Sequence, residues 1–354
     1  MAGVYIHIPF CQSRCKYCDF YSTTRLTGHK AYIDAVIDEW QRRKDELQEP
    51  VETIYIGGGT PSQLPAEEIM RLTQAIGTTT ATEITMEANP GDLSLPYLSV
   101  IQAAGVNRLS LGVQSFQDDL LRLIGRRHNA QQAKEAIQFA RQAGFANLSV
   151  DLIYGLPGQT LRMWEDDIAT LLSFKPEHIS AYCLTYEAGT VLTRMRDNGE
   201  VAEWDDDTLN QYYDILCETL KNNGYWHYEV SNFCLPDCYS RHNGAYWNNI
   251  PYLGLGAAAH SYDGGKRSWN IADIDAYLQG TEQEVEYLTE EQKRLEAIML
   301  GFRTSAGVSA ELVQSKPHVV QDLMRRGYIN QKGARIVATQ KGLHILNTII
   351  SQLV

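Results

Sequence analysis

One stretch near the start of the chain decides how the rest is interpreted. It reads Tyr5-Ile6-His7-Ile8-Pro9-Phe10-Cys11-Gln12-Ser13-Arg14-Cys15-Lys16-Tyr17-Cys18-Asp19-Phe20. A strand-like apolar segment runs directly into three cysteines spaced C-x3-C-x2-C. Thiolates are soft ligands, and closely spaced thiolates are what an iron–sulfur cluster needs. A [4Fe–4S] cluster has four irons, so Cys11, Cys15 and Cys18 would leave one iron open to another ligand.

Two other readings of the cysteines stay open from the residues alone. They could be buried structural cysteines, or they could form part of a zinc site. Structural zinc generally takes four protein ligands, usually as two C-x2-C pairs, and the sequence has no second pair. A disulfide framework is disfavoured because the seven cysteines are odd in number and three of them are crowded together.

The cysteine motif after Tyr-x-His-x-Pro-Phe resembles the radical S-adenosylmethionine (radical SAM) superfamily. The whole phrase is similar to the branch that holds oxygen-independent coproporphyrinogen III dehydrogenase and the HemW haem chaperones. The resemblance implies a [4Fe–4S] cluster on Cys11, Cys15 and Cys18, with the amine and carboxylate of SAM on the open iron. In that superfamily the reduced cluster passes one electron to the sulfonium of SAM.

Composition sets the broad class of protein. The chain has 354 residues, 44% hydrophobic and 21% charged, which is typical of a globular protein with a large core. The sequence contains no run of about 18 apolar residues and no secretion signal, so we expect neither a membrane span nor export. The net charge of −12 disfavours general nucleic-acid binding. We therefore expect a cytoplasmic protein. An alternative location is the inner face of the membrane, where it would be bound peripherally.

Strand-like and helix-like segments alternate from residue 4 to about residue 181, which predicts a parallel sheet of about six β–α units. Periodicity alone does not separate a barrel from a doubly wound sheet; the resemblance favours a partial (β/α)6 barrel, an α/β fold. The predicted strands are 4–8, 53–56, 83–87, 108–112, 148–154 and 178–182, and the predicted helices are 30–47, 67–76, 95–104, 130–143, 161–174 and 206–222.

The chain changes character from Leu288 onward. Helices at 290–302, 310–313 and 319–326, a hairpin at 328–338 and a last helix at 339–352 predict a small winged-helix-like α+β domain. Residues 315–354 carry six basic side chains and one acidic one, so a nucleic-acid-binding regulator is an alternative, although packing or partner docking fits the acidic remainder better. We predict a barrel over 1–225, an extension over 226–285 and this domain over 286–354.

Two motifs end the second and third predicted strands. The glycines of Gly57-Gly58-Gly59-Thr60-Pro61 let the backbone approach a ligand closely, although alone they predict only a tight turn. Glu87, in Met86-Glu87-Ala88-Asn89-Pro90, alone would be a solvated strand end. The resemblance implies that SAM contacts Gly58, Gly59, Thr60 and Glu87, and also Tyr5 in the first strand.

Further candidates follow the fourth and fifth strands. Gln114 could hydrogen-bond the nucleoside or a substrate, and Arg126, twelve residues on, could pair with the SAM carboxylate in a fork geometry. Arg127 is adjacent, so the choice of Arg126 rests on the resemblance. Asp151 lies in an apolar strand that breaks into Gly155-Leu156-Pro157-Gly158-Gln159-Thr160. A lone buried carboxylate is costly, so we expect Asp151 at the barrel mouth, contacting SAM or substrate.

The stretch Ser240-Arg241-His242-Asn243-Gly244-Ala245-Tyr246-Trp247 is similar to a motif of the HemW branch. A neutral imidazole is a good ligand for haem iron, so the resemblance implies haem on His242. A lone histidine is more often a structural hydrogen-bonder. Cys234, Cys238 and His242 also form a C-x3-C-x3-H series that could be a second metal site or a set of thiolate and imidazole ligands for haem.

Two departures from the dehydrogenase pattern favour the HemW branch. The dehydrogenase has a fourth cysteine two residues after the third, where this chain has Phe20, and it has an extension before its cysteine strand. We therefore expect a haem chaperone that delivers haem to haemoproteins such as membrane respiratory enzymes, with a homodimer as a further expectation. The alternative is the dehydrogenase itself, which decarboxylates propionates in porphyrin biosynthesis.

Overall fold

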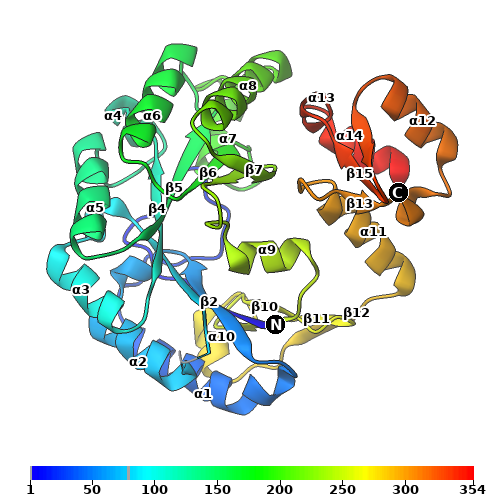
Figure 1. Cartoon of the computed structure of the whole chain (residues 1–354). Helices are drawn as coiled ribbons and strands as arrows, with labels where there is room; N and C mark the ends of the chain where they lie inside the picture. Colours follow the sequence, from blue (N-terminus) through cyan, green and yellow to red (C-terminus); the bar gives the residue numbers. More distant parts are fainter. Residues whose placement is uncertain (1, 78–79) are drawn as a thin grey trace.

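The computed structural model describes residues 2–77 and 80–354. Its centre is a run of six parallel strands that pair in chain order. These strands are β1 (Ala2–Ile8), β2 (Val51–Gly58), β3 (Glu83–Ala88), β4 (Arg108–Gln114), β5 (Asn147–Tyr154) and β6 (His178–Cys183). All six predicted strands are confirmed, and the sheet curves into the expected partial barrel with helices outside (Figure 1).

Alternation along each strand separates a dry outer face from a polar lumen. Ile6 and Ile54 are fully buried in the main hydrophobic core, whereas Tyr55, Glu87 and Asp151 on the inward positions carry polar groups. The covering helices are α1 (His29–Arg43), α2 (Ala66–Ile76), α3 (Leu95–Ala103), α4 (Asp118–Leu123), α5 (Ala130–Gln142), α6 (Leu161–Ser173), α7 (Val191–Asp197) and α8 (Asp206–Asn222).

Both edges of this sheet are extended. Strand β9 (Tyr252–Leu255) pairs parallel to β1 and is followed by antiparallel strands, whereas β8 (Asn232–Cys234) pairs antiparallel to β6. The remaining elements are β7 (Trp226–Glu229), α9 (Arg241–Trp247), β10 (His260–Tyr262), β11 (Lys266–Trp269), α10 (Ile274–Leu278) and β12 (Glu284–Tyr287). The result is a 12-stranded sheet in which α9 joins the two extended edges.

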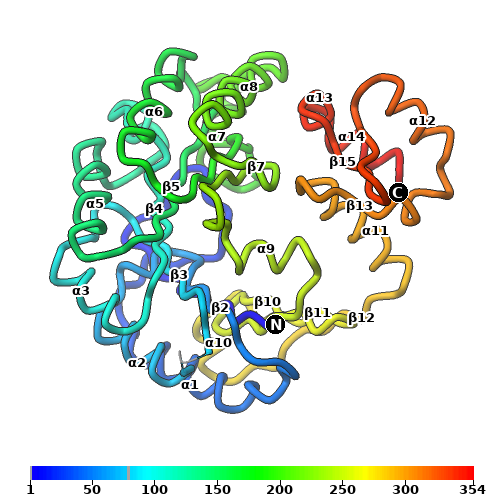
Figure 2. Tube along the Cα trace, viewed as in Figure 1, coloured from blue at the N-terminus to red at the C-terminus, as the bar shows by residue number. Residues whose placement is uncertain are grey.

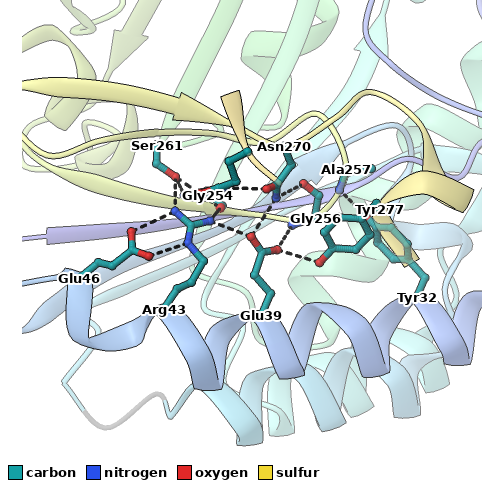
Figure 3. A network of polar contacts seen from close by, with 11 residues as sticks. Tyr32, Glu39, Arg43, Glu46, Gly254, Gly256, Ala257, Ser261, Asn270 and Tyr277 are labelled. Carbon is teal, nitrogen blue, oxygen red and sulfur yellow. Dashed lines mark hydrogen bonds and ion pairs between the residues drawn. The ribbon is translucent and has the colours of Figure 1, made fainter. Parts of the chain in front are cut away.

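A buried polar network fastens α1 to the β9–β11 edge (Figure 3). Arg43 pairs with Glu39 at 2.7 Å and donates to the Gly254 carbonyl at 3.1 Å. Glu39 also accepts from the backbone N–H of Gly256 and from Asn270. Arg43 and Glu39 therefore each make several hydrogen bonds besides their ion pair, and a buried ion pair needs such bonds to offset the loss of water.

The chain from α11 onward folds as a second body beside the barrel (Figures 1 and 2). It has its own hydrophobic core, which includes Ile298, Phe302 and Ile349. Its elements are α11 (Glu290–Gly301), β13 (Val308–Ser309), α12 (Pro317–Arg325), β14 (Ile329–Lys332), β15 (Arg335–Ala338), α13 (Gln340–Leu343) and α14 (Leu346–Leu353).

The predicted hairpin at 328–338 is present as β14–β15, beside β13. The prediction of one final helix over 339–352 is wrong, because the chain breaks between α13 and α14. At the break, Ile345 leaves helical geometry with φ −122° and ψ 29°. Gly342 packs so closely on the Tyr328 carbonyl oxygen that a Cβ would lie 2.0 Å from it. In the described part of the chain, every helix is too short or too polar to cross a membrane.

Candidate functional site

A cavity of about 540 Å³ opens where the parallel strands end and their loops begin. This is the face on which barrels of this type generally place their sites. Ten of the twelve predicted site residues line it: Cys11, Cys15, Cys18, Gly58, Gly59, Thr60, Glu87, Gln114, Arg126 and Asp151. A smaller cavity of about 300 Å³, beside β9 and β10, is lined by none of them.

The three cysteines lie on one loop held against the cavity wall. The backbone of Cys11 bonds to Thr23, and the Lys16 N–H donates to the Ile124 carbonyl. Thr60 Oγ1 lies 3.3 Å from Cys11 Sγ. Burial raises the pKa of the Cys18 thiol to about 11, so without a metal this thiol is neutral.

In the described residues, no group of three or more His, Cys, Asp or Glu converges on a position for one metal ion. This finding disfavours a single zinc ion at the three cysteines. It does not disfavour a [4Fe–4S] cube, because each thiolate of a cube binds a different iron. Cys234, Cys238 and His242 form no such group among the described residues either, and both ring nitrogens of His242 are bonded to other side chains, so a second metal site there stays a prediction.

The glycine loop at the end of β2 forms a cradle with no room for side chains. Gly58 has φ +110°, and a Cβ there would lie 2.5 Å from the His7 ring. A Cβ on Gly59 would lie 2.8 Å from the Pro9 carbonyl carbon. The loop is therefore pressed against the end of β1, next to the cysteines, and this close approach is more than a tight turn alone requires.

Two carboxylates on the inner wall are held by neutral donors. Glu87 accepts from the Tyr55 hydroxyl at 2.8 Å and from the Gly58 N–H at 3.0 Å. Asp151 accepts from Ser110 at 3.2 Å. Burial raises the pKa of Glu87 to about 7 and that of Asp151 to about 6. A cationic ammonium or ribose hydroxyls would supply the compensation that these buried groups lack.

Arg126 and Gln114 meet above β4. Arg126 donates to Cys15 Sγ at 3.3 Å and to the Gly112 carbonyl. A Cβ on Gly112 would lie 3.0 Å from Gln114 Nε2 and 3.1 Å from Arg126 Nη2, so glycine makes the space for both side chains. Gln114 has a left-handed backbone with φ 68°, which is costly for a non-glycine residue and often marks a functional site.

The neighbouring arginine has a different role. Arg127 pairs with Asp92 at 2.8 Å and contacts Gln12. Both arginines are half-buried, but the Nε of Arg126 is buried without a partner among the described residues, whereas one Arg127 contact lies at the exposed rim. Geometry therefore favours Arg126 over Arg127 for an incoming carboxylate.

Two predicted residues lie away from the cavity. Tyr5 sits below it in the lumen, where its hydroxyl bonds to His7 at 3.0 Å and its ring stacks on Tyr55. His242 is 1% exposed and packs near the N-terminal ends of β1 and β2. Its ring nitrogens bond to Thr53 at 2.8 Å and Tyr246 at 2.8 Å. Haem iron binds a single imidazole nitrogen, so ligation by His242 would require one ring nitrogen to leave its partner, either Thr53 or Tyr246, and this role stays a prediction.

Sequence reasoning missed the outer wall of the cavity. Phe20, 65% exposed, and Tyr182, 42% exposed, both line it, together with Cys183. The signal for Tyr182 was its inward position on β6, two residues beyond Ser180. Tyr55 was also missed, although it lies on the same face of β2 as Gly57 and donates to Glu87.

The comparisons with known proteins agree with this geometry. The model of the radical SAM superfamily matches residues 5–171. Proteins called "Heme chaperone HemW" from Lactococcus lactis and Bacillus subtilis are 37% and 36% identical, over 99% of this chain and 96% and 98% of those proteins. The protein of the same name from Escherichia coli is 30% identical over 98% of this chain and 97% of its own length.

Among solved structures, coproporphyrinogen III oxidase (HemN) from Escherichia coli, a radical SAM enzyme, superimposes with a TM-score of 0.83. The superposition covers 99% of this chain and 89% of the HemN chain, at 23% sequence identity, so the likeness establishes the fold. Barrel, cysteine loop and glycine cradle define a radical SAM protein. Within that class, the chain belongs to the HemW haem chaperone family, and the superfamily implies a [4Fe–4S] cluster and SAM.

Proposed function

We propose that the protein is a haem chaperone that holds a [4Fe–4S] cluster, binds SAM and transfers haem to haemoproteins, among them membrane respiratory enzymes. The single observation that carries the proposal is the near full-length similarity to HemW proteins. Phe20 supports it, because an exposed aromatic ring stands where the dehydrogenase pattern has its fourth cysteine.

The residues in the cavity fit the two cofactors. Cys11, Cys15 and Cys18 would hold the cluster, which supplies an electron donor, with SAM as its acceptor. Glu87 would bind the ammonium of SAM, and Arg126 would bind its carboxylate. The glycine cradle would present backbone groups to the methionine part, and Asp151 and Gln114 would bind the nucleoside.

Haem would dock at an apolar surface with an iron ligand. The rings of Phe20 and Tyr182 at the cavity mouth offer flat faces to a macrocycle. His242 is the predicted ligand at the other end of the barrel. The two places are distinct, so a ligand test on His242 also decides which end takes the haem.

Haem titration of the cluster-loaded protein, followed by the Soret band, tests the proposal. We expect saturable binding in the wild type and a changed Soret spectrum in His242→Ala. An unchanged spectrum would remove His242 as ligand and leave the cavity mouth. Absence of haem binding in the wild type would end the chaperone proposal.

An anaerobic assay with coproporphyrinogen III, reductant and SAM, read by mass, tests the enzymatic alternative. Loss of carbon dioxide from the propionates would identify a dehydrogenase. We expect no such loss. A size measurement with and without the cofactors tests the expected homodimer.

A further inference from the structure

Helix α9 closes the end of the barrel opposite the cysteine cavity. The backbone N–H groups of Arg241 and His242 donate to the two carboxylate oxygens of Glu83, each at 3.0 Å. Glu83 is the first residue of β3 and is buried. This clamp fixes the start of α9 under the lumen, and it directs the side chain of His242 inward.

The His242 ring is fixed on every side. Thr53 and Tyr246 bond to its two nitrogens, and Tyr246 also packs edge-on at 5.1 Å between ring centroids. A Cβ on Gly3 would lie 3.1 Å from the ring, so a side chain at residue 3 would press on it. The ring stacks on Tyr55, with centroids 5.2 Å apart and planes 27° from parallel.

Tyr55 continues the contact upward to the cavity. Its hydroxyl donates to Glu87 Oε1 at 2.8 Å, while Oε2 accepts from the Gly58 N–H of the glycine cradle. A Cβ on Gly57 would lie 2.8 Å from Tyr55 Cε1 and 3.0 Å from Glu87 Cδ. The absence of a side chain at residue 57 is therefore what lets Tyr55 and Glu87 meet.

We propose that His242 is a positioning residue for SAM: acting through the ring of Tyr55, it holds the Glu87 carboxylate in place on the cavity wall. The motif that distinguishes this branch is thereby tied to the cofactor end of the barrel. Residues at the two ends are joined by direct contacts, which gives the coupling a physical path. The inference rests on the proposed binding of SAM and is independent of haem.

The test measures SAM affinity by titration calorimetry in cluster-loaded, haem-free protein across about pH 6 to 8. We expect Tyr55→Phe to lower the affinity about tenfold, because a hydrogen bond to a charged carboxylate is lost. We expect His242→Ala to lower it about threefold. In the double variant the losses should not multiply, because His242 acts through the Tyr55 hydroxyl. The pH midpoint of SAM binding should rise in each variant.

His227→Ala is the matched control. His227 stacks on Phe233 at 4.2 Å and bonds to Tyr213, away from the cavity. We expect this variant to lose stability but keep the wild-type SAM affinity and pH midpoint. An equal loss in His227→Ala, multiplying losses in the double variant, or wild-type affinity in His242→Ala would overturn the inference. A wild type that binds no SAM would overturn it too, whereas a wild type that binds no haem would leave it intact.

Discussion

The guanidinium of Arg126 donates a hydrogen bond to the sulfur of Cys15 over 3.3 Å, although 111 residues separate the two in sequence. A fixed cation therefore stands beside the cysteine loop. Its Nε is buried, and among residues 2–77 and 80–354 it has no hydrogen-bond partner. An incoming carboxylate would satisfy this orphaned donor, which makes Arg126 the natural anchor for the carboxylate of SAM.

Exchange of this arginine should therefore weaken SAM binding. We predict that Arg126→Gln lowers SAM affinity about tenfold or more, since a charge-assisted pair is lost. Arg127→Gln is the control, because Arg127 pairs with Asp92 instead. Calorimetric titration of both cluster-loaded variants checks the prediction. Equal affinities in the two variants would show that the assignment is wrong.

Removal of one cysteine should abolish the cluster. We predict that Cys18→Ser, after anaerobic reconstitution, retains little iron and sulfide, because the hard serine oxygen replaces a soft thiolate. Cys217→Ser is the control, since Cys217 is buried in α8 and does not line the cavity. Iron and sulfide analysis gives the readout. If Cys18→Ser held as much iron as Cys217→Ser, the cluster site would lie elsewhere.

The protein free of cluster and SAM should become less stable as the pH rises from about 4.5 to about 7. Burial raises the folded-state pKa of Glu87 from its ordinary value of 4.5 to about 7. Its contribution to stability is thus full below the unfolded pKa and is lost as the pH rises through about 7. The free energy of unfolding should fall by about 1–3 kcal/mol from this group.

Urea unfolding at several pH values, compared with Glu87→Gln, isolates this contribution. The neutral amide should remove part of the fall in the free energy of unfolding. The remaining part should come from Asp151, because burial raises its pKa to about 6. An identical pH profile in the variant would refute the prediction. SAM, as a cation, should bind the ionised Glu87, so its affinity should rise over the same pH range.

The Arg43–Glu39 pair should be far more important for stability than a surface pair. We predict that Arg43→Ala destabilises the fold by about 3–5 kcal/mol, because it leaves the buried Glu39 charge without its cation. Arg122→Ala breaks the exposed pair with Asp119 and should cost less than about 1 kcal/mol. Urea midpoints compare the two, and similar losses would contradict the prediction.

Much of the fold was predictable because local patterns and tertiary packing agree. The strand and helix alternation of the first 181 residues reappears as β1 to β6 and their helices, with ends shifted by a few residues. Helix α6 begins where its Thr160 cap predicts, with the hydroxyl accepting from the Met163 N–H. The final helix was mispredicted because the chain leaves helical geometry at Ile345, a break that no helical periodicity reveals.

The sequence by itself determined the cysteine motif, the order of β–α units and ten of the residues that line the cavity. The motif spacing and the order of units are local properties of the sequence, and the cavity residues follow from the resemblance of its short motifs to the radical SAM superfamily. Only the tertiary structure decided that His242 is buried at the far end of the barrel, that Tyr5 lies below the cavity and that Arg126, not Arg127, contacts Cys15. Curvature of the sheet brings distant residues together, and no local pattern encodes the direction in which a side chain then points.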